Sequence, residues 1–231
     1  MSLSPSLLAL LQRLDTPTVC NAIELAKCKR GFADFTRQTV LASAPQAAVG
    51  YARCARIAGA VEPTEARSVL SARRLAYYEH MAGGPGPRLA VVEDQDFPDC
   101  IGAWWGEVNT AVHKGLGLAG ALTNGVMRDH GDLEPGFPVI AGSIGPSHRF
   151  VHVTDVGGPV EVFGLRIEDG DLVHADRHGA LVIPPSVLGD LEDAVARLVA
   201  AENLILGPAR QADFDIEALR KAWGEFEKAR V

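Results

Sequence analysis

The stretch Gly106–Asp129, GEVNTAVHKGLGLAGALTNGVMRD, decides how the rest of this chain is interpreted. It predicts a helix that begins at Glu107 and then a strand, Leu118–Thr123. Asn124-Gly125 suits a tight turn, and the pair Arg128-Asp129 follows that turn. The stretch therefore indicates a helix–strand unit with an acid at its start and a guanidinium and a second acid at its end.

A continuous apolar run at Arg88–Glu93 predicts a second strand, buried on both faces, ahead of this unit. If it runs parallel to Leu118–Thr123, the loops after both strands open on one edge of the sheet, where α/β proteins bind ligands. We expect Glu107, Arg128 and Asp129 to meet there. Such a cluster suits a divalent metal, Mg²⁺ or Mn²⁺, and a small anionic substrate.

Composition limits the class of protein. The chain has 231 residues, 47% of them apolar, a net charge of −7 and a pI near 5.5. We expect one globular domain over residues 1–231, and the acidic balance argues against nucleic acid or an anionic membrane as partner. The N-terminus lacks the basic region of a signal peptide, and four scattered cysteines indicate reduced thiols, so we expect a cytoplasmic protein without a membrane span.

The flanking elements complete an α/β fold. Apolar spacing predicts helices at Ser6–Leu14, Thr18–Lys27 (capped by Thr16), Glu65–Met81, Pro184 to about Leu204, and Asp215–Arg230. Strands are expected at Thr39–Ala44, Gly50–Ile57, Phe137–Ala141 and Phe150–Val153. From Pro159 onward short strands form a compact β-rich meander, with Asp171 and Asp176 as turn residues. The fold class is a single α/β domain with a mixed or parallel sheet flanked by helices. Residues 6–27 and 186–230 would pack on neighbouring subunits.

Each candidate residue also has an ordinary structural interpretation. Arg128-Asp129 could be a surface ion pair or the cap of a short helix, and Glu107 could be a first-turn acid that the helix dipole favours. Gly102-Ala103-Trp104-Trp105-Gly106 could place tryptophans in the core or offer amides to an anion. The histidines lack metal-ligand spacing, and GLGLAG precedes a strand instead of following one, so zinc and dinucleotide sites are not expected.

Four segments together resemble the RraA-like family, which includes 4-hydroxy-4-methyl-2-oxoglutarate aldolases and the regulator of ribonuclease E activity A. They are TPTVCNAI (16–23), the stretch quoted first, FPVIAGSIGP (137–146) and EDGDLVHADRHGALVIP (168–184). The resemblance runs from about residue 14 to Pro184. It implies a fold of the swivelling β/β/α type, assembled as a homotrimer or a dimer of trimers with sites at subunit clefts.

The resemblance also implies roles for single residues. Asp129 would be the metal ligand, and Arg128 would contact the pyruvyl carboxylate and the enolate oxygen. Glu107 would contact metal-bound water, although the family's aldolases carry Asp there. The backbone of Gly102, Ala103, Trp104, Trp105 and Gly106 would hold the substrate carboxylate, and Glu202 of a neighbouring subunit is a candidate further acid.

These residues predict a divalent-metal-dependent lyase that cleaves, or decarboxylates, a small 2-oxo acid through a pyruvate enolate. Two alternatives remain open. One is a non-catalytic, protein-binding regulator that resembles the ribonuclease E inhibitor branch, against which the acid Glu107 counts. The other is a family member that acts on a different small carboxylate.

Overall fold

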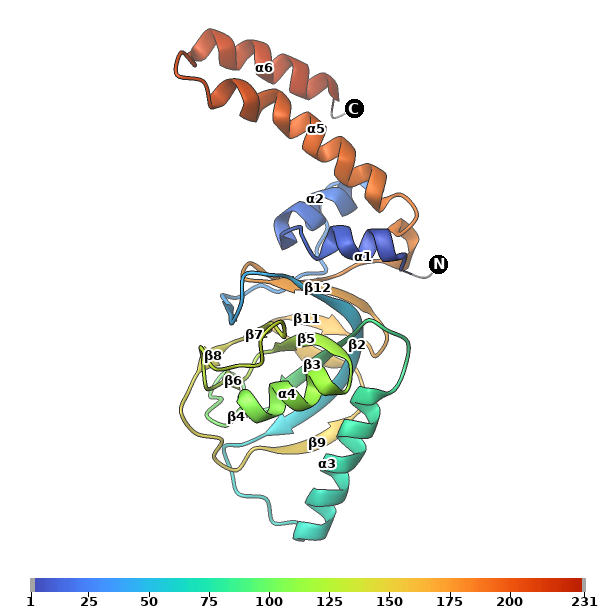
Figure 1. Ribbon diagram of the computed structural model, residues 1–231, viewed down its shortest axis with the longest axis vertical. Coiled ribbons are helices and arrows are strands. Elements are labelled where there is room, and N and C mark those ends of the chain that lie inside the picture. Colours follow the sequence, from blue (N-terminus) through green and yellow to red (C-terminus); the bar gives the residue numbers. More distant parts are fainter. Residues whose placement is uncertain (1–2, 230–231) are drawn as a thin grey trace.

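Strand β2 (Ala48–Ala58) is the central strand of the main sheet in the computed structural model, which describes residues 3–229 (Figure 1). One of its edges pairs in parallel with β3 (Arg88–Asp94). Its other edge pairs antiparallel with β12 (Leu172–Asp176) and then, farther along, with β9 (His152–Val156). Because β2 has one parallel and two antiparallel partners, the sheet is mixed, which agrees with the predicted mixed or parallel sheet.

The sheet order is β1-β7-β5-β3-β2-β12-β13, with β9 beside β2. The remaining strands are β1 (Leu41–Ala42), β5 (Leu118–Thr123), β7 (Val139–Ala141) and β13 (Gly179–Val182). The parallel pairing of β3 with β5 is confirmed. Residues 89–92 of β3 are fully buried, which agrees with a central strand covered on both faces.

A second, smaller sheet was not expected from the sequence. Three short parallel strands form it: β4 (Ala103–Trp105), β6 (Val126–Met127) and β8 (Ser143–Ile144). The sequence analysis named no strand at any of the three, because two or three residues are too few to show the alternation of a strand. This sheet proves decisive for the candidate site.

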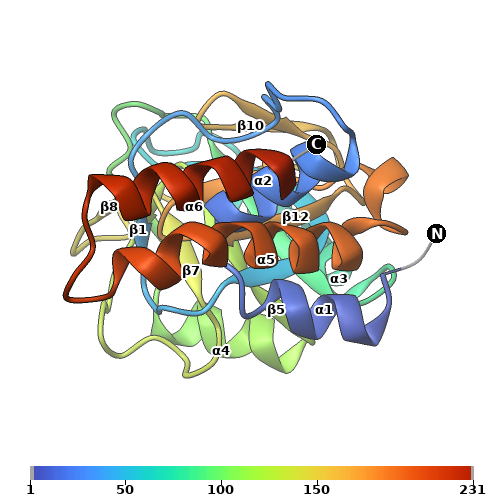
Figure 2. The ribbon, with the colours of Figure 1, turned by 90° about the horizontal axis from the view of Figure 1, so that it is seen from above.

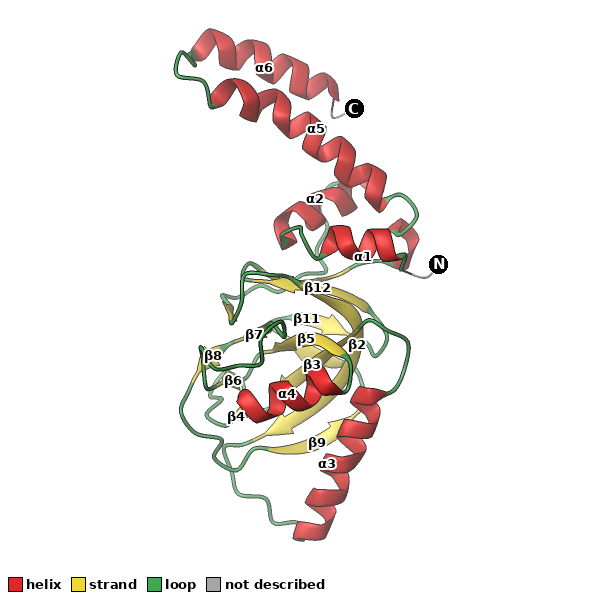
Figure 3. Cartoon of the chain, in the orientation of Figure 1, coloured by secondary structure: helices red, strands yellow, loops and turns green. Residues whose placement is uncertain are grey.

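Two layers cover the main sheet (Figure 3). On one face α3 (Arg67–Ala82) and α4 (Glu107–Gly115) enclose a core that contains Tyr77, Trp105 and Phe137. On the other face lies the hairpin of β10 (Val160–Val162) and β11 (Leu165–Ile167). The meander therefore divides, because β10 and β11 form this cover while β12 and β13 extend the main sheet.

Helices α1 (Pro5–Leu11), α2 (Thr16–Ala26) and α5 (Leu191–Ala209) share a third core with β12 and β13. The predicted cap of α2 was wrong by one residue: the Asp15 carboxylate accepts from the Thr18 amide at 2.9 Å. Thr16 is buried and donates instead to Asp176, at 2.8 Å. Asp176 is thus a residue of β12 and not the turn residue that was expected.

The C-terminal segment forms a helical hairpin. A 3₁₀ turn, η1 (Pro185–Val187), precedes α5, and α6 (Ile216–Ala229) folds back along α5. The hairpin stands away from the sheets in Figure 1 and crosses above α1 and α2 in Figure 2. Packing of residues 6–27 and 186–230 on a neighbouring subunit stays a prediction. Within residues 3–229, no helix combines the length and apolar character that crossing a membrane requires.

Candidate active site

The carboxyl ends of β4 and β6 bring the predicted site residues together. β4 leads through Gly106 into α4, and β6 leads directly into Arg128. The two strands are parallel neighbours, and the Arg128 amide donates to the Trp105 carbonyl at 2.7 Å. Arg128 and Asp129 therefore lie beside the first turn of α4. The expected convergence occurs, but at the edge of the small sheet and not at the edge formed by β3 and β5.

Asp129 joins the two loops. Its Oδ2 accepts from the Glu107 backbone amide at 3.1 Å and lies 3.5 Å from Nη2 of Arg128. Its φ is 54°, a left-handed conformation that Asp tolerates better than most residues. About a third of each side chain of the Arg128–Asp129 pair is exposed, 33% and 31%. The pair is thus held by the protein and remains open to a ligand.

Gly106 makes this close approach possible. A Cβ on Gly106 would lie 2.7 Å from Oδ2 of Asp129 and 2.8 Å from Nε of Arg128. Gly106 has φ −144° and ψ −178°, an extended conformation open to any residue. Space, and not backbone conformation, therefore requires glycine here.

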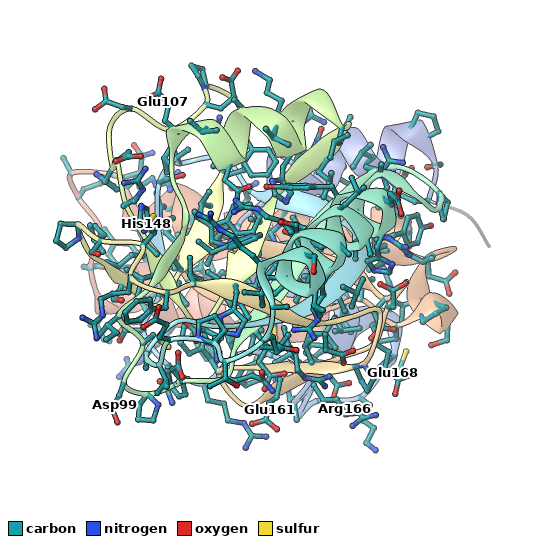
Figure 4. All side chains as sticks on the ribbon, turned by 90° about the horizontal axis from the view of Figure 1, so that it is seen from below. Asp99, Glu107, His148, Glu161, Arg166 and Glu168 are labelled. Atoms are coloured by element: carbon teal, nitrogen blue, oxygen red, sulfur yellow. The ribbon has the colours of Figure 1, made fainter. Side chains whose placement is uncertain are left out.

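The Glu107 carboxylate is exposed and points outward at the edge of the molecule in Figure 4. The described residues offer it no hydrogen bond or ion pair. Position 107 meets Asp129 through its backbone amide, which the first helical turn leaves without an intrahelical acceptor. The structure therefore brings together Arg128, Asp129 and the start of α4, and leaves the Glu107 carboxylate at the rim.

The tryptophans of the predicted cradle belong to the core. Trp104 and Trp105 are 4% and 0% exposed, as the core-packing interpretation predicted. The Ala103 amide already donates to Ser147 at 3.0 Å, and a Cβ on Gly102 would meet Gly59 at 3.2 Å. The Ala103 amide is therefore not free to bind an anion. Anion binding by the other backbone amides between Gly102 and Gly106 stays a prediction.

A buried hydrogen-bond chain fixes α4 against β4 and α3, and the sequence interpretation did not include it. Nδ1 of His113 donates to the Asn109 carbonyl at 2.6 Å, so its Nε2 accepts from the Tyr77 hydroxyl at 2.6 Å. The Trp104 indole donates to the same hydroxyl at 3.2 Å. Burial lowers the pKa of His113 to about 4, so the ring is neutral at pH 7. The only sequence signal was the placement of Tyr77 on the buried face of a helix.

The donor set suits a metal held by few protein ligands. No cluster of three or more His, Cys, Asp or Glu side chains that could hold a metal occurs in residues 3–229. Mg²⁺ keeps several waters and needs only one or two carboxylates, a requirement that Asp129, about one-third exposed, meets. Glu202 is half-buried on α5, which packs on α1, α2 and α6 and lies far from α4 along the long axis of the molecule (Figure 1). In this chain Glu202 is therefore not part of the site.

Comparison with known proteins assigns the chain to a family. The sequence model of the RraA-like family, described as Aldolase/RraA, matches residues 16–182. The chain belongs to the RraA-like family. This family includes both aldolases or decarboxylases and ribonuclease E inhibitors. No curated protein matches the sequence.

Solved structures agree with the RraA-like fold. One is RraAS2 from Streptomyces coelicolor, described as an unusual member of the RNase ES inhibitor RraA protein family. It is 22% identical to this chain, with a TM-score of 0.62, and the match covers 90% of this chain and 98% of RraAS2. An uncharacterized protein from Pseudomonas syringae pv. tomato has 19% identity and a TM-score of 0.66 over 100% and 95%. A protein described among novel cellulases of gut-associated microbes has 18% identity and a TM-score of 0.69 over 88% of both chains. At these identities the likeness concerns the fold alone.

Proposed function

We propose that this chain is a divalent-metal-dependent lyase that cleaves or decarboxylates a small 2-oxo acid. The observation that carries the proposal is the junction of β4, β6 and α4. There Gly106 lets Arg128 and Asp129 stand against a helix N-terminus, and both side chains remain about one-third exposed.

Asp129 would hold Mg²⁺ or Mn²⁺, with its carboxylate oriented by the Glu107 amide. The bound metal would act as a Lewis acid toward the carboxylate and keto oxygens of the substrate. Arg128 would hold the carboxylate with its planar fork and add positive charge where the enolate oxygen develops. The first-turn amides and the dipole of α4 would also stabilise the substrate carboxylate.

The two reactions differ in what they ask of Glu107. Retro-aldol cleavage removes a proton from the hydroxyl on C4, breaks the C3–C4 bond and releases a carbonyl product and pyruvate enolate. Decarboxylation of oxaloacetate breaks a C–C bond with loss of CO₂ and needs no base for that step. The Glu107 carboxylate, at the rim of the site, would accept the hydroxyl proton in the first reaction only.

The test is pyruvate formation from 4-hydroxy-4-methyl-2-oxoglutarate and from oxaloacetate, with Mg²⁺ or Mn²⁺ and after chelation. We expect Arg128→Ala and Asp129→Ala each to lower kcat/KM by about 100-fold or more for both substrates. Arg166→Ala is the matched control, because Arg166 is exposed on the opposite side from Glu107 (Figure 4). Turnover that survives both site substitutions, or the absence of metal-dependent turnover, would refute the proposal.

Glu107→Gln separates the two chemistries. If Glu107 is the base, this variant loses retro-aldol cleavage and keeps oxaloacetate decarboxylation. Equal loss of both activities would assign Glu107 to binding and not to proton transfer. Glu107→Asp, which restores the residue expected from the family's aldolases, provides the conservative comparison.

A second candidate function is protein-binding regulation, which the C-terminal hairpin favours. The α5–α6 hairpin exposes Val199, Leu204, Leu206, Ile216 and Trp223, each at least 38% exposed. Such apolar residues on a projecting element suit a protein partner. Stoichiometric, metal-independent capture of a partner by the wild type, lost in Trp223→Ala, together with absent lyase turnover, would favour this candidate.

We also propose that the chain assembles as a homotrimer or a dimer of trimers, in which the same hairpin contacts a neighbouring subunit. Glu202 on α5 would then be the acid offered to the neighbour's site. Light scattering of the wild type and of Trp223→Ala measures the assembly. Glu202→Gln should lower turnover without changing the mass, and a monomeric wild type would exclude this arrangement.

A further inference from the structure

A groove of about 440 Å³ lies between the first turns of α3 and residues 149–153, on the face of Trp104. Its volume is within the range of small-molecule sites. The groove has an apolar part, to which Leu70, Trp104 and Phe150 contribute, and a cationic part made by Arg67, Arg74 and Arg149. Neither Arg128 nor Asp129 lines it.

The three arginines have no carboxylate partner among residues 3–229. Arg74 lies over the Trp104 ring, 5.0 Å from its centroid, and Arg149 lies 5.3 Å from the ring of Phe150. No ion pair of the described chain includes Arg67. The guanidinium donors of Arg67 and Arg149 are therefore available to an anion, whereas Nη2 of Arg74 also donates to the Tyr78 hydroxyl at 3.5 Å.

Two acids also line the groove, and they do not cancel this charge. Arg73, which is outside the lining, binds both oxygens of Glu65, at 2.6 and 3.1 Å, and this hydrogen bonding lowers the pKa of Glu65. The negative charge of Glu65 is therefore already paired with Arg73. Glu62 remains, a single carboxylate against three guanidiniums.

We propose that this groove binds a small organic anion, in which a phosphate or carboxylate group is attached to an apolar or planar group. The guanidiniums would hold the anionic group through charge-assisted hydrogen bonds. Leu70 and the exposed ring of Phe150 would take the apolar part, while Arg74 lies between the groove and the buried Trp104 ring. The site is distinct from the Arg128–Asp129 site and does not depend on the proposed lyase activity.

The probe is phenyl phosphate, titrated calorimetrically into the wild-type chain at low salt, with phenol and inorganic phosphate as comparison ligands. We expect a dissociation constant between about 10 μM and 1 mM for phenyl phosphate, and weaker binding of both comparison ligands. Benzoate in place of phenyl phosphate shows which anionic group is preferred. No saturable binding of phenyl phosphate or benzoate, or equal binding of inorganic phosphate, would overturn the proposal.

Variants locate the binding. Arg74→Ala and Arg149→Ala should each weaken it by about tenfold or more, while Glu62→Gln should strengthen it. Arg149 is exposed in a loop, so its substitution keeps the test valid if Arg74→Ala loses packing on Trp104. Arg166→Ala and Arg128→Ala should leave the affinity unchanged. If Arg128→Ala abolishes binding and the groove variants do not, the probe occupies the other site and the proposal is wrong.

Discussion

Replacing Gly106 by alanine should damage catalysis far more than folding. The new Cβ would lie 2.7 Å from Oδ2 of Asp129 and 2.8 Å from Nε of Arg128. Ordinary contact begins near 3.4 Å, so the two groups must withdraw by about 0.6–0.7 Å. Withdrawal also takes Oδ2 of Asp129 away from the Glu107 amide, which holds it at 3.1 Å. A displacement of this size at reacting groups costs on the order of 100-fold in rate.

The fold itself has room to adjust. The Arg128 and Asp129 side chains are about one-third exposed, so they can rotate outward without opening a cavity. The extended backbone of Gly106 suits alanine. We expect a loss of about 1 kcal/mol in the free energy of unfolding, or a fall in Tm of about 2–4 °C for a chain of this size.

The assay is kcat/KM for pyruvate formation, measured beside the melting temperature. Gly115→Ala is the matched control, because it lies in the last turn of the same helix and its Cβ would meet nothing within 4 Å. That variant should keep full activity and gain about 0.5–1 kcal/mol. Wild-type activity in Gly106→Ala would refute the reasoning. So would a loss of activity fully explained by unfolding.

Three further predictions concern the buried polar groups, each measured by urea or thermal unfolding. Tyr77→Phe removes the buried hydroxyl shared by His113 and Trp104 and should cost about 2–4 kcal/mol. Tyr78→Phe should cost about 1 kcal/mol, because the Tyr78 hydroxyl is only half-buried, donating to Asn109 and accepting a long bond from Arg74; equal losses would contradict this. Burial lowers the pKa of His113 from 6.5 to about 4, so between these pH values the unfolded chain binds a proton that the native chain does not. The free energy of unfolding should therefore fall by up to about 3 kcal/mol as the pH drops from 6.5 to 4. His113→Gln should show a shallower fall, and an unchanged slope would exclude His113 as the cause. Thr16→Val removes a hydrogen-bond donor to the buried Asp176 carboxylate and should lower the free energy of unfolding by about 1–3 kcal/mol at pH 7. The loss should be smaller at a pH that protonates this carboxylate, and a loss independent of pH would assign the effect to packing.

The main sheet and its helices were largely predictable from the sequence. β5 has its predicted bounds, and β3 extends only one residue beyond the predicted end at Glu93. Buried apolar runs and helical periodicity indicate such elements directly. Capping was less predictable: Asp15 and Thr16 both suit a helix start, and only the tertiary bond from Thr16 to Asp176 decides between them.

The small sheet could not be predicted by the same means. β6 and β8 have two residues each, and they acquire strand geometry only through pairing with a segment distant in sequence. The Tyr77–His113 bond is likewise a contact between two helices that no local pattern records. For the candidate site, therefore, sequence could nominate Arg128 and Asp129 but could not supply the strand that brings them to α4.

Because strand pairing builds the site, Arg128 and Asp129 are its best-supported residues. Arg128 and Asp129 are positioned by backbone pairing of β6 with β4 and by the space left at Gly106, and neither depends on the identity of residue 107. The bond from position 107 to Asp129 uses a backbone amide, which aspartate or glutamate supplies equally. Exchange between these two acids would therefore leave the Arg128–Asp129 pair in place and change only the reach of a rim carboxylate. Glu107→Asp should accordingly alter the retro-aldol reaction, which needs a proton acceptor, more than decarboxylation, which does not.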